Sequence, residues 1–185
     1  MHNAEIYEKL LQNGITKLWL PEMEFLDADA MASRKQLWND TLQMDGLTVF
    51  AVNGYGDLFA WREDDSVLFV EVGPEQYQEF ARSLPDAVFR RILEFAEGSY
   101  VAFCTDDDKA DMDPDDAEDY ISETEATSLL RDCRDTFGDF FTEEQNACLD
   151  KLIGQGFLPD EEAFLSSEEL FQRFGAGSAA GSLLR

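Results

Sequence analysis

The side chains in this sequence with the greatest capacity for chemistry are carboxylates, which crowd the stretch TDDDKADMDPDDAEDYISETE. Within it, Asp111, Asp113 and Asp115 stand at alternate positions, as the first ligands of an EF-hand calcium loop do. However, Asp116 occupies the position where that loop requires glycine, and Ser122 occupies the position of its bidentate glutamate. The pattern therefore favours a solvated, self-repelling charged loop over a calcium site.

Nucleophilic and acid–base catalysis find little support in the remaining residues. His2 is the only histidine, and we expect it to lie in a frayed N-terminus, which argues against Ser-His-Asp and Cys-His catalysis. Cys104, Cys133 and Cys148 lack the C-x-x-C spacing of a zinc site and fit buried thiols in a reducing cytoplasm. With 40 acidic residues, carboxylate pairs are too common to identify acid–base partners. We therefore predict no catalytic, cofactor or metal site, and a protein that is not an enzyme.

The net charge of −26, from 40 acidic and 14 basic residues, restricts the classes of partner. Binding to a nucleic acid requires Lys and Arg to neutralise phosphates, and anionic lipids would repel this chain. No segment reaches the ~20 apolar residues of a membrane span, and the N-terminus does not resemble a signal peptide. We expect a cytoplasmic protein with no nucleic-acid or membrane partner. Its acidity either steers a basic protein partner or serves only solubility.

The stretch VFAVNGYGDLFAW contains the strongest turn signal in the chain. A glycine-rich turn after a strand binds phosphate when a helix follows, because the helix N–H groups then face the anion. Here Gly54 and Gly56 are followed by Asp57, which would repel a phosphate, and by the strand-like DLFAWR. We therefore predict that Gly54, Gly56 and Asp57 are structural residues of a β-hairpin turn.

The hydrophobic periodicity predicts an α+β fold. A period of two over residues 47–72 indicates a three-stranded antiparallel meander with turns at NGYG and EDDS. Spacing near 3.6 residues predicts helices elsewhere. The predicted helices cover residues 4–12, 29–44, 73–84, 85–98, 124–136, 142–154 and 166–174, and two further short strands cover residues 15–20 and 99–104.

The composition divides the chain into four parts. We predict an α+β core over residues 1–104, an acidic loop over 105–123, a C-terminal helical portion packed on the core over 124–175, and a flexible tail over 176–185. The antiparallel β-sheet should contain roughly four to six strands and be covered by the helices predicted between Gln76 and Ala96.

The stretch GLTVFAVNGYGDLFAWREDDSVLFVEVGPEQYQEF resembles the SUKH superfamily, whose bacterial members are largely immunity proteins that neutralise polymorphic toxins. In that superfamily a strand leads into a glycine turn, a Gly-Asp pair and an aromatic strand. Gly54, Gly56, Asp57, Phe59 and Trp61 match this arrangement. The stretch is also similar to the type VI secretion immunity-protein domain, which has a Gly-Asp-Leu-Phe strand. Both resemblances imply an immunity protein that binds a cognate toxin, such as a basic nuclease effector.

Exposed acids are the predicted partner-binding residues, because charges on a solvated rim accelerate the association of an oppositely charged partner. The densest block comprises Asp106, Asp107, Asp108, Asp111, Asp113, Asp115 and Asp116. A second candidate surface at the next hairpin turn comprises Glu63, Asp64 and Asp65. Two other functions stay open: a small ligand-binding module or enzyme with an apolar pocket lined by residues such as Trp61, and a regulatory adaptor protein.

Overall fold

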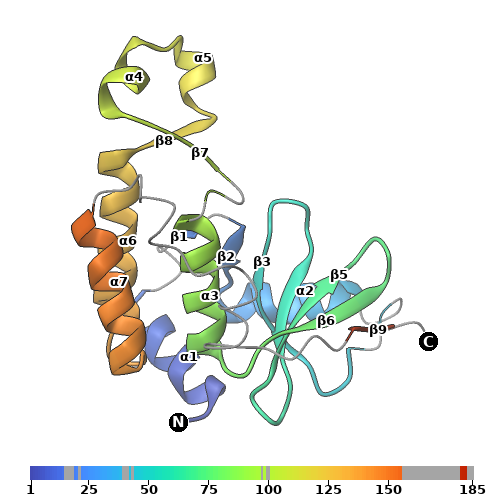
Figure 1. Ribbon diagram of the computed structural model, residues 1–185. Helices are drawn as coiled ribbons and strands as arrows, with labels where there is room; N and C mark the ends of the chain where they lie inside the picture. The colour runs from blue at the N-terminus through green and yellow to red at the C-terminus, as the bar shows by residue number, and fades with distance from the viewer. Residues whose placement is uncertain are drawn as a thin grey trace.

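The computed structural model describes residues 1–14, 19–20, 22–38, 42, 44–96, 98, 101–155 and 180–182 (Figure 1). Its main sheet is antiparallel, in the spatial order β1-β2-β3-β4-β5-β6-β9. Strands β2 to β6 form its body, and the short β1 and β9 extend its edges. The strands are β1 (Trp19–Leu20), β2 (Met23–Phe25), β3 (Thr48–Val52), β4 (Leu58–Trp61), β5 (Val67–Glu71), β6 (Gln76–Ala81) and β9 (Ala180–Ser182).

Helices lie on both faces of this sheet, so the α+β class is confirmed. Helix α2 lies on one face, and α3 lies between the other face and the α6–α7 pair (Figure 1). Two short strands, β7 (Ala102–Cys104) and β8 (Tyr120–Ser122), form a separate parallel pair. The helices are α1 (Asn3–Gln12), α2 (Ala28–Trp38), α3 (Leu84–Ala96), α4 (Asp106–Asp111), α5 (Pro114–Ala117), α6 (Glu123–Phe137) and α7 (Glu143–Gln155).

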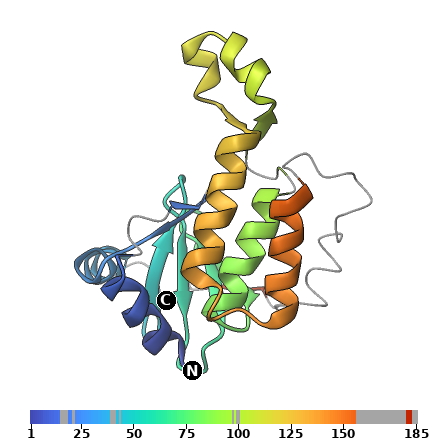
Figure 2. The same ribbon diagram turned by 90° about the vertical axis from the view of Figure 1, so that its left-hand side faces the viewer.

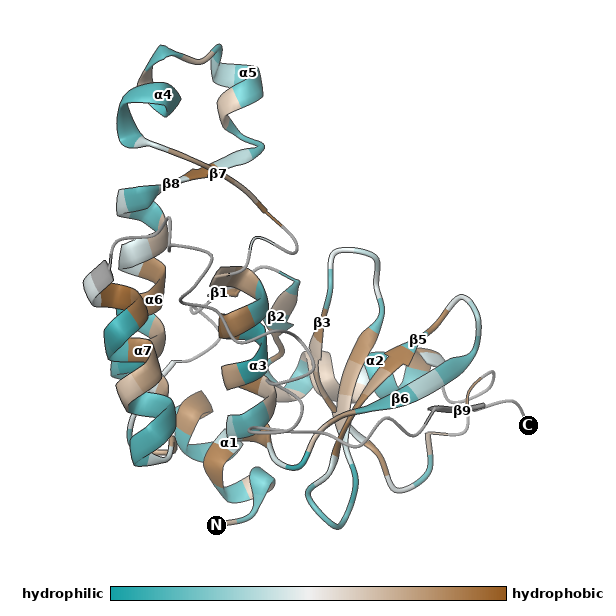
Figure 3. Ribbon diagram, viewed as in Figure 1, coloured by the Kyte–Doolittle hydropathy of each residue, from teal (hydrophilic) through white to brown (hydrophobic). Residues whose placement is uncertain are grey.

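The predicted meander is present as β3, β4 and β5, and it is buried on both faces. Phe50 and Phe59 belong to the hydrophobic cluster shared with α1, α3, α6 and α7, whereas Val49 and Leu58 belong to the cluster beneath α2. Figure 3 shows the corresponding hydrophobic colouring along β3 and β5. Burial on both faces explains why the four residues of β4 are all apolar and all buried. The meander is therefore scaffold, and most of its side chains are not available to a partner.

The helix predicted over residues 73–84 is wrong, because residues 76–81 form strand β6. The spacing of Tyr77, Phe80, Ala81 and Leu84 fits a helix, but the edge of β5 offers unpaired backbone groups that β6 satisfies. Only the second predicted helix, α3, covers the sheet here. Pro85 lies in the first turn of α3, where a missing N–H has no cost.

The segment 105–123, predicted to be a solvated loop, contains α4, α5 and β8. The strand predicted over 99–104 is present in part as β7, which pairs with β8 and not with the main sheet. The C-terminal helices predicted over 124–136 and 142–154 are observed as α6 and α7, and Leu130 and Leu149 bury in the core.

Several predictions fall partly or wholly outside the described residues. The helix predicted over 166–174 lies outside them, as does the first part of the strand predicted over 15–20. In the tail predicted to be flexible, residues 176–185, only Ala180–Ser182 are described, and they form β9, which pairs with β6.

Candidate interaction site

The acidic run folds into a projection at the N-terminal end of α6, here called the acidic head (residues 105–122). Figure 2 shows α4 and α5 standing beyond the ends of α3 and α7. The aspartates predicted to bind a partner are all exposed on this head: Asp106, Asp107, Asp108, Asp111, Asp113, Asp115 and Asp116. The structure therefore brings the first candidate set together on one protruding surface.

Local capping explains why so acidic a segment is helical. At the start of α4, the Thr105 hydroxyl accepts a hydrogen bond from the Asp108 N–H at 3.0 Å. At the start of α5, the Asp113 carboxylate accepts one from the Asp115 N–H at 3.1 Å, and Pro114 occupies the first helical position. Aspartates in a first helical turn also interact favourably with the helix dipole. The segments TDDD and DPDD are thus both helix starts.

Asp106 fastens the acidic head to α6. Its carboxylate accepts hydrogen bonds from the Thr124 hydroxyl at 2.5 Å and from the Thr124 N–H at 3.2 Å, in the first turn of α6. Hydrogen bonds from the Ser122 hydroxyl and from Thr124 hold the pKa of Asp106 below its usual value. This predicted binding residue therefore has a structural task, although its side chain is exposed.

Lys109 makes a second connection between the head and α6. Its ammonium donates to the Tyr120 carbonyl at 2.7 Å and to Glu125 Oε2 at 2.5 Å. Glu125 also accepts from the Ser122 N–H at 2.8 Å, which completes the capping box of α6. The Lys109 ammonium, and next the Ser122 N–H, hold the pKa of Glu125 below its usual value. The head is therefore braced against α6 at both α4 and β8.

The remaining aspartates of the head have no structural role of this kind. Within the described residues, no hydrogen bond is donated to the carboxylates of Asp107, Asp108, Asp111, Asp115 and Asp116. In the same part of the chain, no group of three or more His, Cys, Asp or Glu side chains is arranged to hold a metal ion. The geometry of the head is that of a negatively charged surface open to solvent.

The fold itself uses part of the second candidate surface. Asp65 Oδ1 accepts a hydrogen bond from the Asn3 N–H at 2.8 Å, and its Oδ2 lies 2.7 Å from His2 Nδ1. Asn3, only 1 % exposed, donates to the Asp65 carbonyl and accepts from the Leu84 N–H, each at 2.8 Å. His2 is therefore held against the turn, contrary to the expectation of a frayed N-terminus. Asp65 is a cap for α1.

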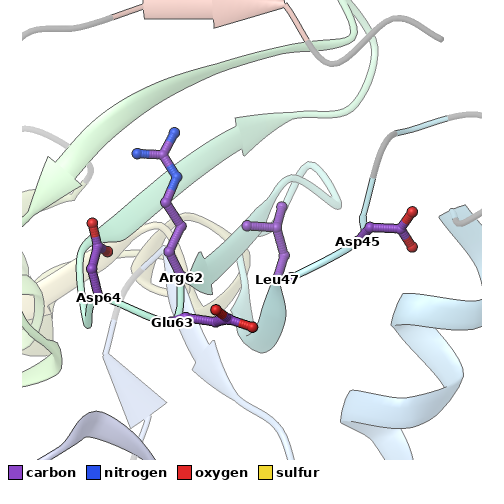
Figure 4. Close-up of a pocket in the computed structure, with 6 residues that line it drawn as sticks. Asp45, Leu47, Arg62, Glu63 and Asp64 are labelled. Carbon is purple, nitrogen blue, oxygen red and sulfur yellow. The ribbon is translucent and has the colours of Figure 1, made fainter.

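Glu63 and Asp64 remain exposed beside a shallow pocket of about 360 Å³ (Figure 4). Hydrogen bonds from the hydroxyl and the N–H of Ser66 hold the pKa of Asp64 below its usual value. Figure 1 places the N-terminus, and with it this turn, at the end of the molecule opposite α4. The two candidate surfaces are thus not brought together. The pocket is lined by Asp45, Gly46, Leu47, Arg62, Glu63 and Asp64.

The turn between β3 and β4 is present at Gly54, Gly56 and Asp57, and its contacts assign each residue a role. Gly56 has a φ of +87°, whereas Gly54 does not have a positive φ. Asn53 Oδ1 accepts from the Asp57 N–H at 2.8 Å. Asp57 Oδ1 in turn accepts from the Val72 N–H at 3.0 Å, directly after β5. The Gly-Asp pair therefore connects the β3–β4 turn with the start of the β5–β6 turn and has a structural role.

Two side chains considered for pockets or chemistry lie inside the core. Trp61 is 7 % exposed and stacks on Phe50 with ring centroids 5.1 Å apart, so its indole packs between α1 and the sheet. Burial raises the pKa of the Cys133 thiol well above its usual value. Both residues therefore contribute packing.

A groove at the base of the head, here called the head groove, is not predicted by any pattern in the sequence. It has a volume of about 410 Å³ and lies between β8 and α6. The residues on its two sides are distant in the sequence, and the parallel pairing of β7 with β8 brings them together. A local sequence pattern therefore does not predict the groove. The lining residues are Val101, Lys109, Glu118, Asp119, Tyr120, Ile121, Glu125 and Leu129.

Comparison of the chain with family models, with curated proteins and with solved structures found no match. In the part of the chain that the structure describes, none of the helices has the length and apolar character needed to cross a membrane.

Proposed function

We propose that this protein is an immunity protein that binds a cognate, basic bacterial toxin in the cytoplasm and blocks it by steric and electrostatic occlusion. The observation that carries the proposal is the acidic head, a braced projection whose aspartates are exposed to solvent. A projecting surface of one charge attracts a partner of the opposite charge and can cover the surface with which that partner binds its own substrate.

The meander gives the proposal further support. The resemblance to immunity proteins depends on a glycine turn followed by a Gly-Asp pair and an aromatic strand, which correspond here to the β3–β4 turn and β4. These residues pack and cap the scaffold, so partner recognition is assigned to surfaces outside the sheet. The head is the most acidic of those surfaces, and its attachment to α6 fixes its position relative to the core.

The proposal is tested by co-expression. The toxin is the C-terminal domain of a large secreted protein encoded beside this chain, and the readout is the survival of cells that produce that domain with and without the chain. We expect survival only with the chain, and a stable one-to-one complex of the two purified proteins. A genome without such a neighbouring reading frame, or cell death despite folded chain, would overturn the proposal.

A further inference from the structure

We infer that the head groove receives an arginine side chain from the basic partner. This inference rests on the proposed function and specifies how that partner would be held once the charge of the head has attracted it. Charge attraction alone accelerates encounter, whereas affinity requires a side chain placed in a pocket of complementary shape and chemistry.

The floor of the head groove is apolar. Val101, Ile121 and Leu129 line it and are half-buried, since each packs partly against the main hydrophobic core. Tyr120, also half-buried, adds an aromatic ring. Such a floor suits the three-carbon stem of an arginine, which buries its methylene groups along apolar surface while the charged end remains at a polar rim.

The rim of the groove is negative. Glu118, Asp119 and Glu125 are exposed and supply carboxylates, whereas Lys109 is the one cation among the described residues that line the groove. The Lys109 ammonium is already held by Glu125 and by the Tyr120 carbonyl. Glu118 and Asp119 accept no side-chain hydrogen bond within the described residues, so their carboxylates can bind a cation from a partner.

Arginine fits this arrangement better than lysine does. Its guanidinium is planar, pairs with carboxylates through two parallel hydrogen bonds and stacks on aromatic rings, here that of Tyr120. Lysine presents a more strongly hydrated point charge, which gains less from an apolar floor. The parallel pairing of β7 with β8 holds Tyr120 and Ile121 in place before binding, so little order has to be created on association.

The test uses the full chain and a capped tripeptide, acetyl-Gly-Arg-Gly-amide, as the probe. Backbone amide signals of the isotope-labelled protein are followed by NMR during titration. We expect saturable shifts at Tyr120, Ile121 and Leu129, and none with the matched tripeptide in which neutral citrulline replaces arginine. An absence of saturable shifts in the groove, or equal shifts with citrulline, would overturn the inference.

Matched variants separate the groove from the general charge of the head. Glu118→Gln with Asp119→Asn should weaken tripeptide binding about 5- to 10-fold. Asp107→Asn with Asp108→Asn makes the same change in charge outside the groove lining and should weaken binding less than about twofold. Equal losses in the two double variants would contradict a specific site and indicate only a diffuse field.

Leu129→Ala changes no charge and tests the floor of the groove. It should weaken tripeptide binding about 2- to 5-fold while the remaining amide signals stay in place, and unchanged binding would contradict a role for the floor. The tripeptide experiments do not involve the toxin. A protein that does not bind the arginine tripeptide would therefore refute the arginine site in the groove and would not refute the proposed function. Failure of the co-expression test would refute the proposed function, whatever the result in the groove.

Discussion

Gly56 has a backbone conformation that other residues adopt only at a cost. Its φ of +87° lies in the left-handed region, and a Cβ added there would meet no atom within 4 Å. We therefore predict that Gly56→Ala destabilises the protein by about 1–2 kcal/mol through backbone strain alone. Chemical denaturation with the variant and the parent protein measures this difference in the free energy of unfolding.

Two other glycines serve as controls for Gly56. Gly73 does not have a positive φ and has no atom near an added Cβ, so Gly73→Ala should be neutral or slightly stabilising. Gly54 would place a Cβ 3.3 Å from Glu22 Oε1, the movable end of a side chain, so Gly54→Ala should cost less than Gly56→Ala. Equal stability of the Gly56 and Gly73 variants would show that this turn does not need its left-handed residue.

At the scale of elements, Asn3 joins three segments that are distant in sequence. Its side chain connects the start of α1 with the Asp65 carbonyl in the β4–β5 turn and with the Leu84 N–H at the start of α3. Asn3→Ala leaves the buried Leu84 N–H and the half-buried Asp65 carbonyl without this partner, and we predict a loss of about 2–4 kcal/mol in the free energy of unfolding. Gln12→Ala, at the exposed last position of α1, is the control and should change stability by less than about 0.5 kcal/mol.

Denaturant unfolding of both variants decides whether Asn3 has this role. A loss at Asn3 no larger than that at Gln12 would mean that α1 is held by its apolar face alone, through residues such as Ile6 and Leu10.

The joint between the acidic head and α6 should depend on pH. The pKa values of Asp106 and Glu125 are lower in the folded protein than their usual values of 3.8 and 4.5. Groups with a lowered folded pKa stabilise the fold fully above the unfolded pKa and lose that contribution as pH falls through the folded pKa. We therefore expect the contacts between α4 and α6 to be complete above about pH 5 and to weaken below about pH 4.

Carboxyl-carbon NMR titration of Asp106 measures this joint directly. Thr124→Val removes one hydroxyl donor while the backbone N–H remains, so the pKa of Asp106 should rise toward its usual value in this variant. The same titration curve for Asp106 in both proteins would show that the bond to Thr124 does not anchor the head.

At the scale of the whole molecule, the position of the charge should matter as well as its amount. Replacing the exposed aspartates of the head that have no capping role should slow association with the toxin, because these charges attract a basic partner. It should also flatten the dependence of the association rate on salt, because salt screens charges that lie farther apart than roughly 8 Å. Asp106 and Asp113 are kept, since they hold helix starts. The substitutions are Asp107→Asn, Asp108→Asn, Asp111→Asn, Asp115→Asn and Asp116→Asn.

The control for this prediction neutralises as many exposed acids elsewhere on the protein. Stopped-flow measurement of the association rate at several salt concentrations compares the two variants with the parent chain. Equal slowing in the head variant and the control variant would mean that association depends only on the net charge of −26 and not on the position of the charges on the head. The control substitutions are Glu8→Gln, Asp29→Asn, Asp132→Asn, Asp135→Asn and Asp139→Asn.

The sequence by itself determined the features that depend on near neighbours in the chain. The meander follows from alternation and from turn residues, and the Asn53–Asp57 turn closes through contacts among residues four or fewer apart. The start of α7 follows from a capping box, in which Thr142 and Gln145 exchange hydrogen bonds at 2.9 Å and 3.2 Å. Such interactions need only local geometry, so the pattern of residue types specifies them.

The tertiary structure decided everything that depends on which distant segment a residue meets. Residues 76–81 could satisfy a helical or a strand pattern, and the open edge of β5 selected the strand. Asp106 and Asp107 are alike in sequence, yet only Asp106 meets Thr124 and becomes an anchor. The head groove likewise exists only because β7 pairs with β8 across the intervening helices. These three features depend on hydrogen-bond partners and packing surfaces that are distant in the chain, so a local sequence pattern does not predict them.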